Sequence, residues 1–430
     1  MSHPFLFICP ICGTEESIEH HRCRMCGTEF HWEQGKFRLP AESLSAHQML
    51  QRMSETIPLQ QTSRHIPESF RKRLPHGLEP WRISQPAVLR QARNNITFRG
   101  FQGLFSRNIE VPLPVDRGHL VFYPEEVVFV GEKRVHRFPL TDFTCVTTNS
   151  HYFEFKLKKR PFYQIEFRRE SALKYEILFR KWLDRFYREQ GKRILEYQPM
   201  LRVVAPECPA TRAVLYPTGT PVPGKVEKWV VKTILALIRW FGRRWLGMRT
   251  QGNQQLPEEY PFILLANHQS IVDPFLILAL LDSRIAFLTK STSFISPLAR
   301  YFLRIGRGIP TTRYQTDPLV YPYVRQALER NIPVGIFPEG ERCWDGARQP
   351  IKMNVVRLLC YFAVPIVVVS LCNVYSAWPR WQTLPTRGNG RMVVGYPFCL
   401  NQRANFSLQD FRQFLETQLD RCQMPGEEQS

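Results

Sequence analysis

Four short apolar runs, each separated from the next by a helical pattern, most strongly constrain how this 430-residue chain can fold. They are FILLANH (262–268), IAFLTK (285–290), VGIFPEG (334–340) and VPIVVVSL (364–371). Apolar runs that alternate with helices are typical of an α/β sheet, in which polar groups collect at the strand ends. We therefore predict a C-terminal α/β domain over residues 250–420, a mixed sheet flanked by helices.

The N-terminus carries two C-x-x-C-G knuckles separated by ten residues, Cys9 with Cys12 and Cys23 with Cys26. Four thiolates at this spacing suit a tetrahedral Zn²⁺ ion, and the glycines let each knuckle turn sharply. We predict a small structural zinc ribbon over residues 5–35, closed to further ligands and without a catalytic role. A redox pair is the alternative. Docking, stabilisation and nucleic-acid contact all stay open as its purpose.

A β-rich pattern follows over residues 80–192, after a polar linker at 41–78 that contains a short predicted helix near 42–54. Alternating or β-branched runs are separated by turn signals. The pattern ends in a helical stretch at 170–190. Several strands followed by one helix resemble a pleckstrin-homology (PH) or GRAM-like domain. Its basic side chains could meet anionic headgroups or form a solvated strand face.

Residues 193–224 are predicted as a second linker, because PTGTPVPG (217–224) is the clearest Pro/Gly break in the chain. Residues 225–249 then form a basic amphipathic pattern, with Lys and Arg on one arc, aliphatic residues opposite and tryptophans on the flank. Such a helix can lie in a membrane surface or pack on the domain core. The two interpretations are compatible.

The chain is strongly basic, with a net charge of +20 from 58 Lys+Arg against 38 Asp+Glu. This balance favours anionic partners such as an acidic membrane surface, an acyl carrier protein or a phosphorylated substrate. No helix-turn-helix or aromatic-basic RNA motif indicates nucleic-acid binding. No secretory signal is visible, and the longest apolar runs are less than half of the roughly 20 residues of a spanning helix. We expect a cytoplasmic chain, peripherally associated with membranes.

Two motifs about seventy residues apart carry the candidate chemistry, NHQSIVD (267–273) and FPEGER (337–342). His268 lies five residues before Asp273, and a histidine oriented by a carboxylate can take a proton from a hydroxyl. Asp273 also precedes Pro274 and an apolar helix, where a helix cap is the alternative. A glycine turn after a strand can hold a phosphate. Together the motifs suggest that a phosphate-bearing alcohol is made nucleophilic.

A further block, RIGRGIPTTR (304–313), lies between these motifs, and Arg348 and Lys352 follow them. In this order and at these intervals the blocks resemble the glycerolipid acyltransferase family, which is PlsC-like and includes lysophosphatidic acid acyltransferases. The resemblance covers about 250–400. It implies transfer of a fatty acyl group from a thioester of coenzyme A or acyl carrier protein to a glycerolipid hydroxyl, with 1-acylglycerol 3-phosphate as the type of acceptor.

By position, the resemblance implies that His268 is the general base and that Asp273 orients it. No serine or cysteine nucleophile is then required. It further implies that the substrate-binding residues are Asn267, Ser270, Arg313, Glu339, Gly340 and Lys352.

Two positions depart from the family pattern. Arg307 stands where the family usually has a glycine six residues before the arginine, and residues 351–354 read IKMN where a glycine is common. Both positions concern acceptor recognition rather than the base. We expect an acyltransferase that acts on a lysophospholipid. The alternatives are an acyltransferase for another lipid acceptor and a non-catalytic scaffold that binds membranes or partners.

Overall fold

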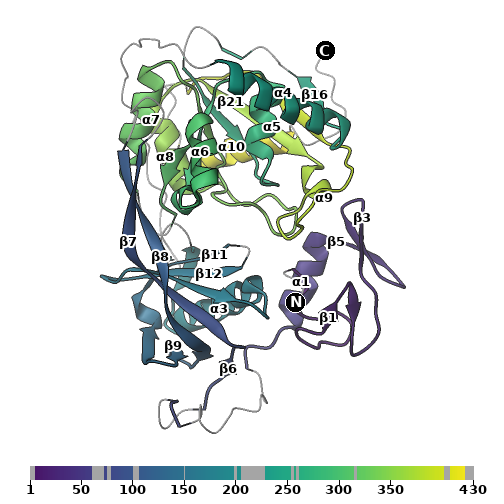
Figure 1. Cartoon of the computed structure of the whole chain (residues 1–430), viewed down its shortest axis with the longest axis vertical. Helices are drawn as coiled ribbons and strands as arrows, with labels where there is room; N and C mark the ends of the chain where they lie inside the picture. Colours follow the sequence, from purple (N-terminus) through teal and green to yellow (C-terminus); the bar gives the residue numbers. More distant parts are fainter. Residues whose placement is uncertain are drawn as a thin grey trace.

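The computed structural model (Figure 1) has an α/β domain at the top, a β-rich domain below it and a small N-terminal unit beside the latter. The residues that the structure describes are 5–60, 72–74, 79–99, 106–149, 151–197, 201–204, 228–252, 256–257, 261–313, 317–400 and 407–421.

A seven-stranded mixed sheet forms the centre of the α/β domain, in the order β16-β22-β21-β17-β20-β18-β19. All neighbours are parallel except β21 and β22. The strands are β16 (Arg249–Gly252), β17 (Ile263–Ala266), β18 (Ala286–Lys290), β19 (Ile309–Thr311), β20 (Val334–Ile336), β21 (Ile366–Cys372) and β22 (Arg391–Val394).

Helices cover both faces of this sheet: α4 (Lys228–Arg244), α5 (Asp273–Leu280), η3 (Ser291–Phe294), α6 (Pro297–Ile305), α7 (Val320–Glu329), α8 (Met353–Phe362), α9 (Val374–Ala377) and α10 (Leu408–Arg421).

The central strand β17 explains why its apolar run is continuous rather than alternating. Ile263 and Leu265 belong to a core formed with α7, α8 and α10, whereas Leu264 and Ala266 belong to the opposite core, formed with α4 and α5. A strand with helices on both faces buries every side chain. The first polar residues after such a strand lie at the edge of the sheet, and here they include His268.

The β-rich domain contains eight antiparallel strands and a following helix. The main path runs β10-β9-β8-β7-β13-β12-β11, and β6 pairs with β8. This order and the final helix fit the predicted PH-like domain, which stays a prediction. The elements are β6 (Arg82–Ile83), β7 (Ala87–Arg99), β8 (Ser106–Phe122), β9 (Glu126–Gly131), β10 (Val135–Pro139), η2 (Leu140–Asp142), β11 (Phe143–Asn149), β12 (Tyr152–Leu157), β13 (Phe162–Phe167) and α3 (Ala172–Arg188), followed by the hairpin β14 (Arg193–Glu196) and β15 (Arg202–Val204).

Strands β7 and β8 form a long hairpin, here called the arm, that reaches from the β-rich domain to the α/β domain (Figure 1). The rings of Phe98 and Phe294 lie 4.3 Å apart, and the Tyr323 hydroxyl donates to the Ser106 carbonyl at 2.8 Å. The arm therefore ties the two domains together.

The N-terminal unit extends further along the chain than the predicted ribbon. Its elements are β1 (Ile18–Glu19), β2 (Arg22–Cys23), β3 (His31–Glu33), β4 (Lys36–Arg38), β5 (Ser43–Ser45) and α1 (Ala46–Thr56). Helix α1 starts with a capping box between Ser45 and Gln48 and buries Met49 and Met53. The first part of the predicted linker at 41–78 is therefore packed structure, and 61–71 and 75–78 lie outside the described residues.

The predicted linker at 193–224 contains β14 and β15, whereas PTGTPVPG lies outside the described residues. The predicted amphipathic helix corresponds to α4, whose side chains are described from Thr233 onward. Among the described helices, none has the length and apolar character needed to cross a bilayer.

Candidate active site

His268 and Asp273 lie against each other in the loop between β17 and α5. The imidazole Nδ1 is 2.9 Å from the Asp273 Oδ2 atom, which also accepts the backbone N–H groups of Gln269 at 2.6 Å and Ser270 at 2.7 Å. Asp273 is fully buried, and these donors compensate for its lost hydration. Its carboxylate turns back toward the loop and makes no capping bond to α5, so the structure favours the orienting role over the cap.

The His268 ring is held in a defined orientation. Phe337 stacks on it with ring centroids 4.0 Å apart and 15° between the planes. Because the carboxylate of Asp273 accepts from Nδ1–H, Nε2 is the nitrogen that can accept a proton. Nε2 has no hydrogen-bond partner among the described residues. Burial lowers the pKa of His268, and Asp273 opposes this change. The imidazole is therefore a neutral, oriented base near pH 7.

Phe337 also lines a cavity of about 350 Å³ that brings together three predicted substrate-binding residues, Arg313, Gly340 and Lys352. The rest of the wall is largely apolar, with residues such as Leu288 and Leu358. A cavity of this size with a few convergent polar groups is typical of small-molecule sites. Burial lowers the pKa of Arg313, which keeps its charge because a guanidinium does not deprotonate in proteins.

Glu339 is not among the residues that line this cavity. Its side chain is buried, and its two oxygens accept the backbone N–H groups of His268 at 3.3 Å and Gln349 at 3.2 Å. Burial raises the pKa of Glu339 to about 8. Gly340 follows with a φ of 80°, a left-handed conformation that favours glycine. The Glu339 carboxyl therefore links the loop between β17 and α5, here called the histidine loop, to the loop after the FPEG motif.

Asn267 and Ser270, also predicted to bind substrate, are buried and do not line the cavity. The Asn267 side chain donates to the Leu371 carbonyl at 2.8 Å and accepts from the Leu371 N–H at 2.7 Å. It thus ties the end of β17 to β21. The Ser270 hydroxyl is fully buried and has no hydrogen-bond partner among the described residues.

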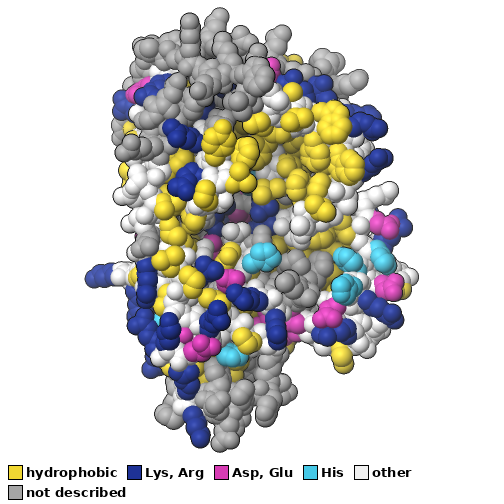
Figure 2. Space-filling view, viewed as in Figure 1, with side chains coloured by type: hydrophobic (Ala, Val, Ile, Leu, Met, Phe, Trp, Pro, Cys, Tyr) yellow, Lys and Arg dark blue, Asp and Glu magenta, His cyan; other side chains and the backbone are white. Residues whose placement is uncertain are grey.

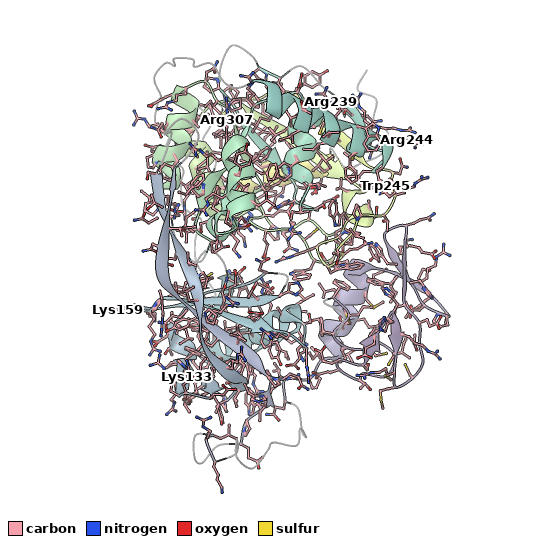
Figure 3. The ribbon with its side chains drawn as sticks, in the orientation of Figure 1. Lys133, Lys159, Arg239, Arg244, Trp245 and Arg307 are labelled. Carbon is pink, nitrogen blue, oxygen red and sulfur yellow. The ribbon has the colours of Figure 1, made fainter. Side chains whose placement is uncertain are left out.

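Arg307, the first departure from the family pattern, lies just after the C-terminus of helix α6. Its φ is 58°, in the left-handed region, and the following Gly308 N–H donates to the Leu303 carbonyl at 2.7 Å. Helices commonly end with glycine in this conformation. Arg307 therefore adopts the backbone conformation for which a glycine would be better suited. Figure 3 labels Arg307 in the upper domain.

The arm of the β-rich domain anchors the loop that carries Arg313. Arg107 donates to the Pro310 carbonyl at 2.9 Å and pairs with Asp317 at 2.5 Å, and Asp317 accepts the Thr312 N–H at 2.7 Å. Nothing in the local sequence indicates the role of Arg107, because its partners lie about 200 positions away.

Other side chains join the β-rich domain to the same region. Lys290, at the end of β18, pairs with the buried Glu154 of β12 at 2.5 Å. Arg380 donates to the Arg342 carbonyl at 3.0 Å and to the Thr148 carbonyl of β11. Through these residues the β-rich domain is joined to the end of β18 and to the segment after the FPEG motif, and no motif in the sequence indicated these contacts.

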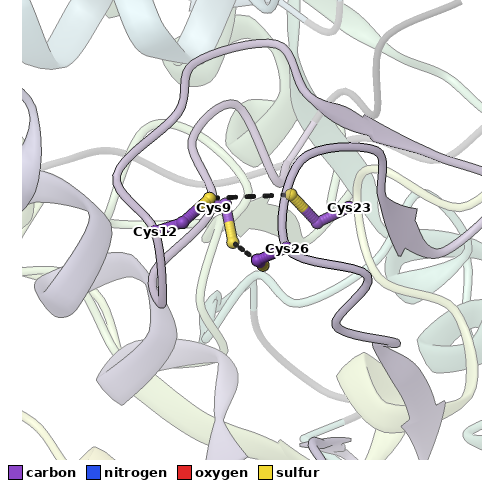
Figure 4. A group of neighbouring side chains, drawn as sticks. All are labelled: Cys9, Cys12, Cys23 and Cys26. Atoms are coloured by element: carbon purple, nitrogen blue, oxygen red, sulfur yellow. Dashed lines mark hydrogen bonds between the residues drawn. The ribbon is translucent and has the colours of Figure 1, made fainter.

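The four N-terminal cysteines converge as their spacing predicts (Figure 4). Their Sγ atoms all lie within 4.8 Å of one another, with 3.6 Å between Cys9 and Cys26 and 3.7 Å between Cys12 and Cys23. A tetrahedral ion with Zn–S bonds of about 2.3 Å separates its sulfurs by about 3.8 Å. The donor set and its separations therefore fit a structural Zn²⁺ ion.

Exposed apolar side chains gather on the face of the α/β domain that Figure 2 shows. We call this surface the apolar rim; its members are Leu237, Trp240, Ile271, Leu298, Tyr301 and Phe302. They come from α4, the histidine loop and α6. The opposite side of α4 packs on the domain, where Arg239 donates to the Ala279 carbonyl at 2.6 Å and pairs with Asp282 at 3.0 Å. Helix α4 thus packs on the core and exposes an apolar flank.

Comparison with known proteins agrees with these motifs. The protein family described as Acyltransferase matches residues 247–371. A chloroplastic 1-acyl-sn-glycerol-3-phosphate acyltransferase BAT2 from Brassica napus is 26% identical over 151 residues, which are 34% of this chain and 44% of that protein. A 1-acyl-sn-glycerol-3-phosphate acyltransferase from Limnanthes alba is 30% identical over 124 residues, 27% of this chain and 43% of that protein.

The human 1-acyl-sn-glycerol-3-phosphate acyltransferase beta is 29% identical over 152 residues, 34% of this chain and 53% of that protein. The chain spans about half the length of the curated relatives it matches. The crystal structure of the 1-acyl-sn-glycerophosphate acyltransferase PlsC from Thermotoga maritima aligns with a TM-score of 0.37 at 23% identity, covering 46% of this chain and 82% of that one. The family match supports the acyltransferase resemblance of residues 247–371, which include His268, Arg313 and Glu339.

Proposed function

We propose that this protein transfers a fatty acyl group from a thioester to the hydroxyl of a lysophospholipid, with 1-acylglycerol 3-phosphate as the type of acceptor. The observation that carries the proposal is the position of the His268 ring. Its Nδ1 atom bonds to the buried carboxylate of Asp273, and its face stacks on Phe337, which lines the cavity that contains Arg313. The relatives named for 1-acyl-sn-glycerol-3-phosphate agree with this acceptor class.

The proposed reaction uses this geometry. Nε2 of His268 takes the proton of the acceptor hydroxyl while its oxygen attacks the thioester carbonyl carbon. A new C–O bond forms, the C–S bond breaks, and the departing sulfur receives the proton from the imidazolium. The products are an ester and a free thiol. Asp273 holds Nδ1–H in place and stabilises the imidazolium while it exists.

The cavity supports recognition of a phosphorylated lipid. Arg313 can bind a phosphate in a bidentate manner, and Lys352 adds a second positive charge. The apolar residues of the same cavity, including Val320 and Leu358, can accommodate hydrocarbon. An acceptor that carries both a phosphate and an acyl chain therefore matches the lining better than a fully polar one.

The apolar rim supports binding at a membrane surface, where a lysophospholipid would be found. Trp240 and Leu237 are each about two-thirds exposed on α4, and Ile271 lies in the histidine loop itself. Exposed apolar side chains next to a site on a basic chain are suited to an anionic bilayer surface. The cytoplasmic and peripheral location is part of this proposal.

The cysteine cluster supports a structural Zn²⁺ ion held by Cys9, Cys12, Cys23 and Cys26. The ion would stabilise the N-terminal unit and have no role in the reaction. We expect one zinc per chain by atomic emission, and a fall in melting temperature when a chelator is added. A Cys12→Ser variant with unchanged zinc content and unchanged melting temperature would contradict the assignment.

The decisive assay uses purified full-length protein, labelled acyl-CoA or acyl carrier protein, and a panel of lysophospholipids that differ in headgroup. We expect His268→Ala to lower acyl transfer by about 10²- to 10⁴-fold while the melting temperature and zinc content hold. Asp273→Asn should lose activity while keeping the fold. Full activity of the His268→Ala variant would refute the mechanism, and preference for an unphosphorylated acceptor would favour another lipid substrate. A wild-type protein that binds vesicles without any transfer would favour the scaffold alternative.

A further inference from the structure

A groove of about 880 Å³ lies between the N-terminal unit and the α/β domain, and one of its lining residues is Gln269, which directly follows His268. The turn between β3 and β4 forms one wall, and the segments 373–376 and 386–389 form the other. Trp32 Nε1 donates to the Ser376 carbonyl at 3.2 Å and holds the two walls together. We propose that this groove binds the phosphopantetheine arm of the acyl donor. The inference rests on the proposed function and extends the donor site to the N-terminal unit.

The amide groups of the groove suit the amides of a pantetheine chain. The Gln269 Oε1 atom accepts the Tyr375 N–H at 3.2 Å, and its Nε2 group has no hydrogen-bond partner among the described residues. The side-chain amide of Asn389 likewise has no described partner. A pantetheine arm carries two amides in line between its thiol and its phosphate. Such a chain needs donors and acceptors spread along its path, and this lining supplies them.

Two cations in the groove suit the phosphate at the far end of the arm. Lys36 comes from the N-terminal wall and Arg387 from the α/β wall, and both side chains are exposed. Neither forms an ion pair with a described residue. Glu33, the acidic side chain of the groove, is instead paired with Arg38 at 3.0 Å. Charge-assisted hydrogen bonds to phosphate oxygens are among the stronger polar contacts in proteins.

Arg387 is further held by stacking over the Trp245 ring at 5.5 Å. Figure 3 shows Trp245 at the edge of the upper domain, on the side of the N-terminal unit. A guanidinium held on an aromatic ring loses less freedom when it binds an anion than a fully mobile one. The cation is therefore oriented before the ligand arrives.

The groove suits the donor rather than the acceptor, because the acceptor's phosphate already has its own cations. Arg313 and Lys352 line the cavity that Phe337 also lines. The groove is a different space, and Gln269 is the residue of the histidine loop that lines it. If the reacting groups of both substrates meet at His268, the rest of each bound substrate must extend away from His268 along a separate path. Coenzyme A and acyl carrier protein present the same arm, so the groove fits the chemistry that both donors share.

The experiment compares four donors with the full-length protein: acyl-pantetheine, acyl-phosphopantetheine, acyl-CoA and acylated carrier protein. The variants are Lys36→Glu, Arg387→Glu and their combination, with Lys133→Glu on the β-rich domain as the matched charge change. For the double variant we expect kcat/KM to fall by about tenfold or more with the three phosphate-bearing donors, and by less than about twofold with acyl-pantetheine. The KM for the acceptor and the activity of Lys133→Glu should stay within about twofold of wild type.

A loss that is equal for all four donors, or that is absent for all four, would overturn the inference. Of acyl-CoA and acylated carrier protein, the donor with the larger loss of kcat/KM depends more on these cations. Either order supports binding of the donor in the groove. If the wild type transfers from none of the donors, the proposed function fails, and calorimetry with free coenzyme A then decides about the groove. Weaker binding to the double variant than to wild type supports the groove, and equal binding refutes it.

Discussion

Replacement of Glu339 by glutamine tests whether this buried acid is protonated in the folded protein. The Glu339 carboxyl is only 2% exposed, and no basic side chain forms an ion pair with it among the described residues. Burial raises its pKa to about 8 from 4.5. The folded protein therefore binds this proton more tightly than the unfolded chain does, and stability is lost as pH rises from about 4.5 to about 8.

The size of the change in unfolding free energy follows from the interval between the unfolded and folded pKa values of Glu339. Each pH unit between the two pKa values corresponds to about 1.4 kcal/mol, so the full interval is worth about 5 kcal/mol of unfolding free energy. The loss is complete above the folded pKa of about 8. Glutamine does not titrate and resembles the neutral acid in shape. It replaces one of the two accepting oxygens by an NH2 group, which costs about 1 kcal/mol at every pH.

Urea unfolding of the two proteins at pH 5, 7 and 9 measures the difference. We expect Glu339→Gln to be slightly less stable than wild type at pH 5 and more stable by a few kcal/mol at pH 9. Glu339→Ala should be less stable than Glu339→Gln at every pH, because it leaves the N–H groups of both His268 and Gln349 unpaired. Glu132→Gln, an exposed site, serves as the control.

The result that would refute this reasoning is a parallel pH dependence of the wild type and Glu339→Gln. Glu339 would then be ionised in both states, and its two accepted hydrogen bonds would be sufficient to hold the charge. A Glu132→Gln variant that reproduced the effect would point to a general change in net charge instead.

Three further predictions concern the elements around the site. Arg307→Gly should raise the free energy of unfolding by about 0.5–1 kcal/mol, because it relieves the left-handed backbone at the end of α6, and chemical denaturation would measure this. Arg107→Met should raise the KM for the acceptor by about tenfold with little change in the KM for the donor. The reason is that the buried Asp317 would lose its ion-pair partner and release the loop that carries Arg313. Equal changes in both KM values would contradict a role of Arg107 in positioning that loop. Trp240→Glu should weaken vesicle co-sedimentation by about tenfold while activity on detergent-dispersed substrate holds, and unchanged sedimentation would argue against the apolar rim as the membrane surface.

The parts of the site that the sequence predicted are those encoded within a few residues. His268 and Asp273 are five positions apart in one loop, and the four cysteines lie in two tight knuckles, so local spacing was sufficient. The α/β sheet was predictable for a related reason. A strand buried on both faces must be apolar throughout, and β17 shows that run.

The parts that the sequence did not predict depend on pairs of residues far apart. Arg107 and Asp317 are 210 positions apart, and Glu154 and Lys290 are 136 apart, so neither pair forms a local pattern. The end of the arm was missed for the same reason, because Phe98 and Ile109 are buried in a core cluster of the α/β domain, far away in the sequence. The packed start of the predicted linker had a readable signal, Ser45 three residues before Gln48, which its polar composition obscured.

The two proposed substrate sites have a kinetic consequence, because neither Ser270 nor Cys343, which both adjoin His268, is suited to form a covalent intermediate. The Ser270 hydroxyl is fully buried. Cys343 is also buried, and desolvation raises the pKa of its thiol well above the ordinary value, so that it carries no thiolate near pH 7. We therefore expect the acyl group to pass directly between two substrates bound together.

A direct transfer of this kind predicts a sequential mechanism. Initial rates measured against donor at several acceptor concentrations should give intersecting double-reciprocal lines, and Cys343→Ala should keep most of the activity if the fold holds. Parallel lines, together with an acylated protein trapped when acceptor is withheld, would show a covalent intermediate instead. Such an outcome would also remove the reason for separate donor and acceptor sites, since a single site could then serve the two half-reactions in turn.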